Sequence, residues 1–306
     1  FCGMGVCHEC LVEVNGENNV RACMRKLDSN AIIFKQKQVK ITKFKNEPLY
    51  QKKGSDKYFS DLLIIGGGIG GLSAALVASN CGVNTVLIDD REKLGGQFYK
   101  QPIIGDNAKC DEQVIFGNKL INKVIKNGVS IFTNTSVFAI FEKKEILAIK
   151  DNVLITFIPK KIIFSTGAYE RGYPVKGWTL PGVMTTGAMQ SLLKGYNVLA
   201  GKKILMCGNG PFILHVAKEL KKAGAKIVAI SEKSNKPTIL DYKILFHLLL
   251  NSFKLFIKGI RYLFFLKFNR IPIFYSYEIS GIEETAYGLT GTIMSTGGKD
   301  HKSFEV

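Results

Sequence analysis

The sequence DLLIIGGGIGG, residues 61–71, decides the fold of this chain. A four-residue apolar run, Leu62–Ile65, enters a glycine cluster and then a helical stretch, Gly71–Cys81. A second apolar run, Asn84–Ile88, follows at once. The order strand, glycine turn, helix, strand is the βαβ unit of a parallel sheet. The sequence therefore predicts an α/β fold.

Three glycines of this turn have the spacing G-x-G-x-x-G, at Gly66, Gly68 and Gly71. Gly66 allows the tight turn off the strand, Gly68 lets the backbone approach a pyrophosphate, and Gly71 lets the helix lie close to the sheet. The first helical N–H groups, those of Ile69 and Gly70 included, then face the phosphates. The pattern predicts a dinucleotide site, and a glycine-rich turn without a ligand is the alternative.

Asp89 ends the second strand, 23 residues after Gly66, where a carboxylate accepts hydrogen bonds from an adenosine ribose. A short spacer leads from Asp89 to Gly95-Gly96. An acid followed by Gly-Gly resembles the FAD-binding half of the two-dinucleotide-domain flavoproteins, which include glutathione and thioredoxin reductases. The resemblance implies further FAD contacts at Gly96, Gln97, Val137, Thr166 and Gly167. A disulfide reductase is disfavoured, because no cysteine pair follows Gly95-Gly96 or Gly208.

The same order of elements recurs later in the chain. A strand, a turn, a helix and a strand are predicted at Lys203–Cys207, Gly208–Gly210, Phe212–Ala223 and Lys226–Ile230. Ile213 stands where the third glycine belongs, and Glu232 lies beside the ribose position at Ser231. The turn therefore predicts a second, NAD-like Rossmann domain. Its nucleotide, NAD(P) or another, stays open, with Gly208, Gly210 and Glu232 as the candidate contacts.

Four of the seven cysteines lie in the first 23 residues. Their spacing is C-x4-C-x2-C-x12-C, and the first three match the plant-type [2Fe–2S] pattern. The set comprises Cys2, Cys7, Cys10 and Cys23. An odd total with tight local clustering favours metal ligation over a disulfide framework. Zinc is the competing metal, and the neighbouring flavin domain favours iron–sulfur.

These segments together resemble the hydrogen cyanide synthase, opine oxidase, sarcosine oxidase and dye-linked proline dehydrogenase family. Phe1–Cys10 and Arg21–Cys23 resemble its small ferredoxin-like component. Leu94–Tyr99, Thr166–Arg171 and Gly177–Gly187 resemble its large flavoprotein component. The resemblance implies a fusion of the two, with FAD and a [2Fe–2S] cluster as cofactors. The chain is expected to be an internal fragment of a longer protein.

The resemblance also implies an FAD-dependent oxidoreductase that acts on CH–NH or CH–NH2 donors. The substrate class is a small amine, imino acid or opine, such as sarcosine, proline or glycine. A second, D-amino-acid-oxidase-like flavoprotein subunit is the implied partner. An NAD(P)H-dependent ferredoxin-type reductase and a non-catalytic electron-transfer subunit are the alternatives. No catalytic residue is assigned; for Glu170 and Arg171 a structural ion pair is favoured over a substrate contact.

The fold class is therefore a two-dinucleotide-binding-domain flavoprotein, preceded by a partial ferredoxin-like β-grasp module. The expected domains are the partial [2Fe–2S] module, a linker, the FAD-binding domain, the NAD(P)-like domain and the start of a return to the FAD domain. Their expected ranges are 1–45, 46–60, 61–182, 183–290 and 291–306.

Charge and hydropathy exclude some partners. The formal net charge is +17, but the lysines are spread along the chain and no nucleic-acid-binding motif accompanies them, so no nucleic-acid partner is expected. No signal peptide or membrane span is visible, and a cytoplasmic protein is expected. The most apolar stretch, Ile244–Phe268, is interrupted by basic residues. It favours a pair of amphipathic helices on a protein surface over membrane-surface contact.

Overall fold

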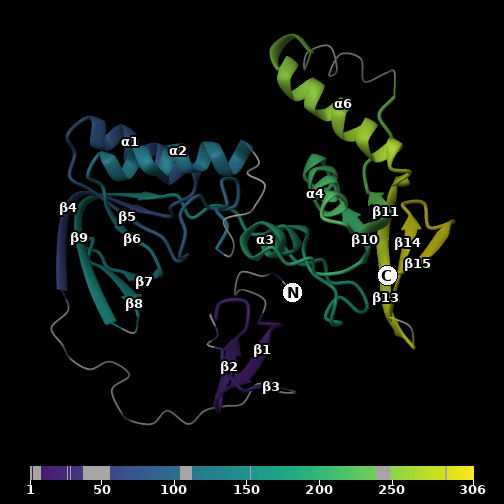
Figure 1. Cartoon of the computed structure of the whole chain (residues 1–306), viewed down its shortest axis with the longest axis horizontal. Coiled ribbons are helices and arrows are strands. Elements are labelled where there is room, and N and C mark those ends of the chain that lie inside the picture. Colours follow the sequence, from purple (N-terminus) through teal and green to yellow (C-terminus); the bar gives the residue numbers. More distant parts are fainter. Residues whose placement is uncertain are drawn as a thin grey trace. The chain divides into compact units, whose positions relative to one another are not determined.

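A computed structural model of the chain describes residues 2, 8–25, 27, 29–36, 56–103, 112–151, 153–238, 249–286 and 288–306. The chain divides into two compact units (Figure 1). Unit 1 comprises Phe1–Lys40, Glu170–Leu193 and Val198–Val306, and unit 2 comprises Ile41–Tyr169 and Lys194–Asn197. The first glycine motif thus belongs to unit 2, and the second glycine motif and the cysteines of the N-terminal segment belong to unit 1.

Unit 2 is built on a six-stranded sheet with the order β6-β5-β4-β9-β8-β7. Strands β6, β5, β4 and β9 are parallel, and β8 and β7 continue the sheet in antiparallel pairing. The strands are β4 (Asp56–Ile65), β5 (Thr85–Ile88), β6 (Ser130–Phe132), β7 (Thr135–Ile140), β8 (Ile146–Lys150) and β9 (Val153–Phe164). The predicted βαβ unit is present, with β4 and β5 joined by α1 (Ile69–Asn80).

The apolar run of β4 is buried because both faces of the sheet are covered. Ile64 points to the face that packs against α1 and α2 (Glu112–Lys126), where it meets Leu72 and Val124. Leu63 and Phe157 belong to the core of the opposite face. Figure 1 shows α1 and α2 side by side along the sheet.

Two boundaries in unit 2 differ from the sequence prediction. β4 begins at Asp56, so residues 56–60 of the predicted linker are strand, while residues 46–55 lie outside the described part of the chain. The apolar runs Val153–Ile158 and Ile162–Phe164 predict two strands from the sequence, and the structure has one strand across both, β9. The reason is long-range pairing, because β9 runs beside β4 from Ile155 opposite Asp56 to Phe164 opposite Ile65.

Unit 1 contains the second Rossmann-like unit. Its parallel sheet has the order β10-β11-β12, formed by Lys203–Gly208, Lys226–Glu232 and Ile273–Tyr275. The described residues of unit 1 include the helices α4 (Pro211–Lys222), α6 (Phe253–Phe268) and most of α3 (Thr186–Tyr196). Val216 and Leu220 of α4 pack with Leu266 of α6 in one apolar cluster. Of the two amphipathic helices predicted in Ile244–Phe268, α6 is one, and residues 241–248 lie outside the described residues.

A three-stranded antiparallel sheet follows in the same unit. It consists of β13 (Tyr277–Thr285), β14 (Gly288–Ser295) and β15 (His301–Glu305), in that order. Residues 291–306, where we expected the chain to turn back to the FAD-binding domain, form the end of β14 and all of β15. The domain boundaries stay predictions.

The N-terminal segment forms a small antiparallel sheet with the order β2-β1-β3. Its strands are β1 (Leu11–Val14), β2 (Glu17–Arg21) and β3 (Ile33–Lys35). Asn15 and Gly16, both with positive φ, form the two-residue turn between β1 and β2. Asn-Gly is favoured in such turns because both central residues need positive φ.

Among the described helices, none combines the length and the apolar character that a bilayer crossing requires.

Candidate functional site

The first glycine turn is held by three very close backbone approaches. Gly66 has φ +106°, and a Cβ there would lie 2.3 Å from the Ser165 carbonyl oxygen. A Cβ at Gly71 would lie 1.9 Å from the Gly66 carbonyl oxygen. The Ser165 N–H donates to the Ile65 carbonyl over 2.8 Å. The glycines thus pack α1, the end of β4 and the end of β9 against one another, as their spacing predicted.

Gly68 differs from these two, because its missing side chain leaves open space. The nearest atom to an added Cβ is the Gly96 Cα, at an ordinary 3.7 Å. Gly68 is also the N-cap of α1, and no side chain caps that helix end. An open backbone at the start of a helix is what a pyrophosphate requires. The residues present therefore fit the phosphates of a dinucleotide, with Ile69 and Gly70 opening the helix.

The Gly-Gly segment that follows Asp89 lies directly against this turn. The Gly95 N–H donates to the Gly67 carbonyl over 2.8 Å. A Cβ at Gly96, whose φ is +60°, would lie 2.8 Å from the Gly68 Cα. The two glycine segments, distant in the sequence, therefore meet, and exposed Gln97 follows beside them.

Asp89 is buried and turned towards the glycine turn. Its Oδ2 accepts the Gly67 N–H over 2.5 Å, and its Oδ1 accepts the Arg91 N–H over 2.8 Å. Burial raises the pKa of the Asp89 carboxyl, and these two hydrogen bonds oppose the shift. Asp89 thus fixes the turn, a role that sequence reasoning missed. Its oxygens keep further lone pairs, so the predicted ribose contact stays a prediction.

A half-buried lysine, Lys100, follows the Gly-Gly segment. Burial, together with the positive charges of Arg91 and Lys194, lowers the pKa of Lys100 to about 8, against the opposing charge of Asp90. The charge of Lys100 is therefore sensitive to pH in the mildly alkaline range.

The remaining predicted FAD contacts lie on two strands or directly after them. Thr166 and Gly167 follow the end of β9 and are exposed, and Gly167 has φ +78°. Ser165, just before them, has its Oγ 2.9 Å from the position of a Cβ on Gly70. Val137 lies on β7, and its side chain packs against the core on one face of the sheet. Contacts from these residues to FAD stay predictions.

The second glycine turn has a buried glutamate in the place of Asp89. Gly208 lies opposite Glu232 in the parallel pair β10–β11. The Gly210 N–H donates to both carboxylate oxygens of Glu232 over 3.1 Å. The Ser234 hydroxyl donates to the same carboxylate over 2.7 Å. The second strand, predicted to end at Ile230, continues to Glu232, which follows the expected ribose position at Ser231.

Ile213 changes how the second helix meets its turn. It is buried, and its Cδ1 lies 3.4 Å from the position of a Cβ on Gly208. The second turn therefore accommodates a side chain at the position where Gly71 lets α1 contact the backbone of the first turn. Cys207, just before Gly208, is partly buried, and the loss of solvent around its thiol raises the pKa of that group to about 12 against a hydrogen bond with Ser231.

The N-terminal hairpin brings two of the predicted cluster ligands together. The Sγ atoms of Cys10 and Cys23 lie 3.3 Å apart. Cys10 precedes β1 and Cys23 follows β2, and the Ala22 N–H donates to the Cys10 carbonyl. Cys2 is buried, and Cys7 lies outside the described residues. Within the described part of the chain no three metal-binding side chains converge, and the close thiol pair fits part of a cysteine-ligated cluster.

Glu170 has a role that the sequence did not predict. Its Oε2 accepts the Gly187 N–H over 2.5 Å in the first turn of α3. A carboxylate at a helix N-terminus satisfies a free donor and complements the helix dipole. Glu170 therefore caps α3.

The model of the pyridine nucleotide-disulphide oxidoreductase family matches residues 60–244, which is more than half of the chain. The chain belongs to this family. The model of a 2Fe-2S iron-sulfur cluster binding domain matches residues 1–38. The predicted cofactor classes are thereby confirmed, since the chain carries an FAD-binding pyridine nucleotide-disulphide domain and a 2Fe–2S cluster-binding domain.

Curated relatives include components of several oxidases. An opine oxidase component from Agrobacterium tumefaciens is 29% identical over 193 residues, 58% of this chain and 38% of the relative. The HcnB component of hydrogen cyanide synthase from Pseudomonas aeruginosa is 28% identical over 225 residues, 71% of this chain and 47% of the relative. The chain thus spans less than half the length of these relatives. The predicted family resemblance is confirmed.

Solved structures confirm the fold class. L-proline dehydrogenase from P. horikoshii matches with a TM-score of 0.58 and 22% identity, over 74% of this chain and 44% of that one. Thioredoxin reductase from T. acidophilum matches with a TM-score of 0.57 and 17% identity, over 81% of this chain and 74% of that one. The fold is that of thioredoxin-reductase-like α/β flavoproteins, preceded by a ferredoxin-like segment.

Proposed function

We propose that this chain is the electron-transferring part of an oxidoreductase that oxidises a small amine, imino acid or opine at its C–N bond. One observation carries the proposal, namely the joining of a 2Fe–2S domain to a dinucleotide-binding flavoprotein fold in one chain. The relatives named as opine oxidase and sarcosine oxidase components support the donor class. A second flavoprotein subunit that holds the substrate completes the proposed enzyme.

The cysteines support single-electron transfer over disulfide reduction. Outside the N-terminal cluster the sequence has isolated cysteines at Cys81, Cys110 and Cys207. Cys81 is exposed at the end of α1, and Cys207 is partly buried with a raised thiol pKa. A disulfide reductase needs two neighbouring thiols of which one is reactive as a thiolate. The flavin domain offers no such pair in its sequence.

The proposed function uses two sites, one for the flavin and one for the iron–sulfur cluster. A bound flavin takes up two electrons and releases them singly, and a [2Fe–2S] cluster carries one. Gly68 and the start of α1 would hold the pyrophosphate of a bound FAD, and Asp89 keeps the turn in shape. Cys2, Cys7, Cys10 and Cys23 would supply the thiolates of the cluster. We assign no catalytic acid or base.

An anaerobic titration tests this function. The holoprotein, with and without its partner subunit, is titrated with proline, sarcosine, glycine, opines and NADH, while absorbance and EPR follow the flavin and the cluster. The proposal expects an amine or opine to bleach the flavin and then to produce the EPR signal of a reduced cluster. Reduction by NADH alone, with every amine inert in the complete complex, would contradict it.

A second candidate function is an NAD(P)H-dependent ferredoxin-type reductase. Glu232 favours it, because a carboxylate at the end of the second strand accepts hydrogen bonds from a ribose. The same charge repels a 2′-phosphate, so this candidate expects NADH to bleach the flavin much faster than NADPH. Equal rates, or a preference for NADPH, would contradict the assignment of Glu232.

A further inference from the structure

Helix α6 carries an uncovered apolar row along one side. Phe253, Ile260, Phe264 and Phe268 follow each other at intervals of seven, four and four residues, so they share one helix face. Their exposed fractions are 58%, 48%, 69% and 80%. The rings of Phe264 and Phe268 stack on each other, with centroids 6.5 Å apart. This is a continuous apolar surface among the described residues.

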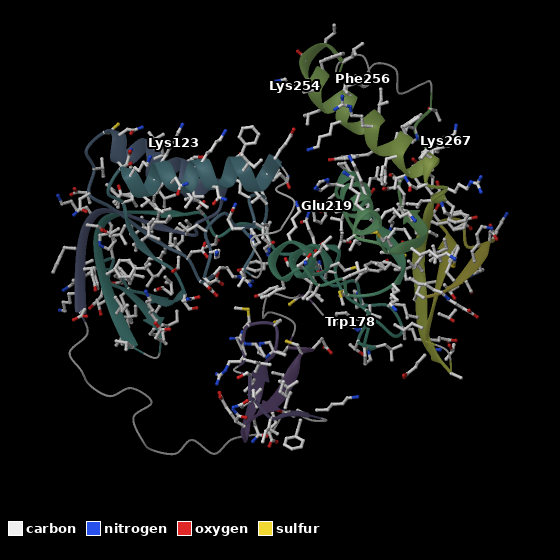
Figure 2. All side chains as sticks on the ribbon, viewed as in Figure 1. Lys123, Trp178, Glu219, Lys254, Phe256 and Lys267 are labelled. Carbon is white, nitrogen blue, oxygen red and sulfur yellow. The ribbon has the colours of Figure 1, made fainter. Side chains whose placement is uncertain are left out.

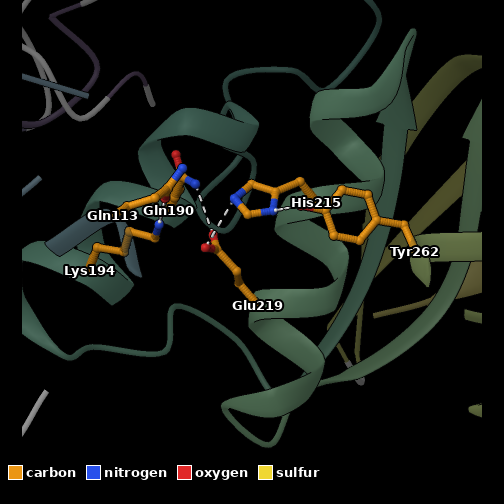
Figure 3. Close-up of polar contacts among 6 residues, drawn as sticks. All are labelled: Gln113, Gln190, Lys194, His215, Glu219 and Tyr262. Atoms are coloured by element: carbon orange, nitrogen blue, oxygen red, sulfur yellow. Dashed lines mark hydrogen bonds and ion pairs between the residues drawn. The ribbon is translucent and has the colours of Figure 1, made fainter. Parts of the chain in front are cut away.

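The opposite side of α6 is fixed to the rest of unit 1. Tyr262 and Leu266 are buried against α4. The Tyr262 hydroxyl lies 2.9 Å from His215 Nδ1, and His215 Nε2 lies 3.1 Å from a Glu219 oxygen (Figure 3). The Gln190 side-chain amide donates to the other Glu219 oxygen over 2.8 Å. These polar contacts fix the orientation of α6 about its axis, so that the phenylalanines of the apolar row face the solvent.

The flanks of the apolar row are positively charged throughout. The 16 residues of α6 include four basic side chains and neither Asp nor Glu. The four are Lys254, Lys258, Arg261 and Lys267. Lys254 and Lys267 lie towards the two ends of the helix (Figure 2). On α4, burial lowers the pKa of Lys218, and the charges of Lys222, Arg261 and Lys258 lower it further, against Glu219. Positive charge therefore accumulates where α4 and α6 meet.

We propose that α6 docks on an anionic lipid surface, with Phe264 and Phe268 entering the bilayer interface and the basic side chains contacting the headgroups. A surface helix with aromatic residues on one face and lysine and arginine beside them has this affinity. At 16 residues, α6 is about 24 Å long, so it lies in the membrane plane and does not cross.

The composition of the row favours lipid over a protein partner. Protein interfaces carry about one hydrogen bond per 100–200 Å². The outer row consists of phenylalanine and isoleucine, whose side chains neither donate nor accept hydrogen bonds. A lipid interface suits both the apolar row and its basic flanks. Acyl chains need no hydrogen bonds, and anionic headgroups pair with the flanking cations.

Vesicle sedimentation of the full 306-residue chain tests the proposal. The expected result is binding to vesicles of phosphatidylcholine mixed with phosphatidylglycerol, much weaker binding to phosphatidylcholine alone, and release at high salt. Phe264→Ser with Phe268→Ser should weaken binding at least about tenfold. The matched control is Phe116→Ser with Phe138→Ser, two phenylalanines of unit 2 that are 56% and 55% exposed, and it should bind like the parent.

A charge pair completes the design. Lys254→Gln with Lys258→Gln should weaken binding by about fivefold for each lysine. Lys119→Gln with Lys123→Gln, on α2, should leave binding unchanged. The absence of binding to anionic vesicles, or equal losses in the α2 controls, would overturn the proposal. A dimer that dissociates on the phenylalanine substitutions, in a protein that binds no vesicles, would also overturn the proposal, because the apolar row would then contact a second copy of the chain.

Discussion

Alanine substitutions at three neighbouring glycines separate the fold from the cofactor site. At Gly71, a Cβ would lie 1.9 Å from the Gly66 carbonyl oxygen, and it must retreat about 1.1 Å to reach 3.0 Å, below which Cβ contacts essentially do not occur. Both atoms belong to the backbone, so α1 itself must move. We expect Gly71→Ala to destabilise unit 2 by about 3 kcal/mol, at the upper end of overpacking costs.

At the other two positions the structure leaves room. A Cβ at Gly70 would meet the Ser165 Oγ at 2.9 Å, and that hydroxyl is able to rotate away. Gly70→Ala also gains about 1 kcal/mol of helix propensity, so its net effect on stability should be small. Gly68 has φ −76° and ψ −173°, which alanine adopts freely. Gly68→Ala should leave the stability of the apoprotein unchanged within about 0.5 kcal/mol.

The order of the three variants by FAD affinity should differ from their order by stability. Gly68→Ala places a methyl group where the pyrophosphate approaches, so FAD affinity should fall at least about tenfold, or about 1.4 kcal/mol. Gly70→Ala should bind FAD more tightly than Gly68→Ala. Urea denaturation of the apoproteins gives the stabilities, and quenching of flavin fluorescence gives the dissociation constants. Unchanged FAD binding by Gly68→Ala, or a stability loss equal to that of Gly71→Ala, would refute the reasoning.

Three further predictions concern single groups. Cys23→Ser should lower the iron content of the reconstituted protein, whereas Cys81→Ser, at an exposed cysteine, should not; equal iron in both variants would remove Cys23 from the ligand set. Because burial raises the pKa of Asp89, its contribution to stability is present below its unfolded pKa and is lost as the pH rises through the folded pKa. The stability of Asp89→Asn relative to the parent, measured by urea denaturation, should therefore improve as the pH rises above about 4, and an opposite trend would show that hydrogen bonds to the carboxylate dominate. Tyr262→Phe removes the hydroxyl beside His215 and should cost about 1 kcal/mol of stability, while an unchanged denaturation midpoint would show that these polar contacts do not fix the orientation of α6.

The local elements of the fold were predictable from the sequence. An apolar run, a glycine turn and a helical stretch in the sequence predict β4, α1 and β5. The predicted end of β4 and the predicted start of α1, on the two sides of the glycine turn, agree with the structure within about two residues. The β1–β2 hairpin that joins Cys10 to Cys23 depends on Asn15-Gly16, a local signal that could have been read. Such features depend on near neighbours in the chain, so the sequence pattern is sufficient.

Features set by distant pairing were not predictable. β9 continues through Pro159 because β4 lies beside it over most of its length, a fact that neither strand shows alone. Asp89 was expected to face a ribose, and its bond to the Gly67 N–H depends on the three-dimensional path of the turn. The apolar character of α6 was visible, but which of its faces packs on α4 is decided by Tyr262 and Leu266.

The absorption spectrum of the chain after anaerobic reconstitution with FAD, iron and sulfide tests the central claim most directly. The account predicts flavin bands together with the broad visible absorption of a [2Fe–2S] cluster, with one FAD and one cluster per chain and both features bleached by a chemical reductant. A protein that retains no flavin, or that binds zinc at its N-terminal cysteines and excludes iron, would contradict it.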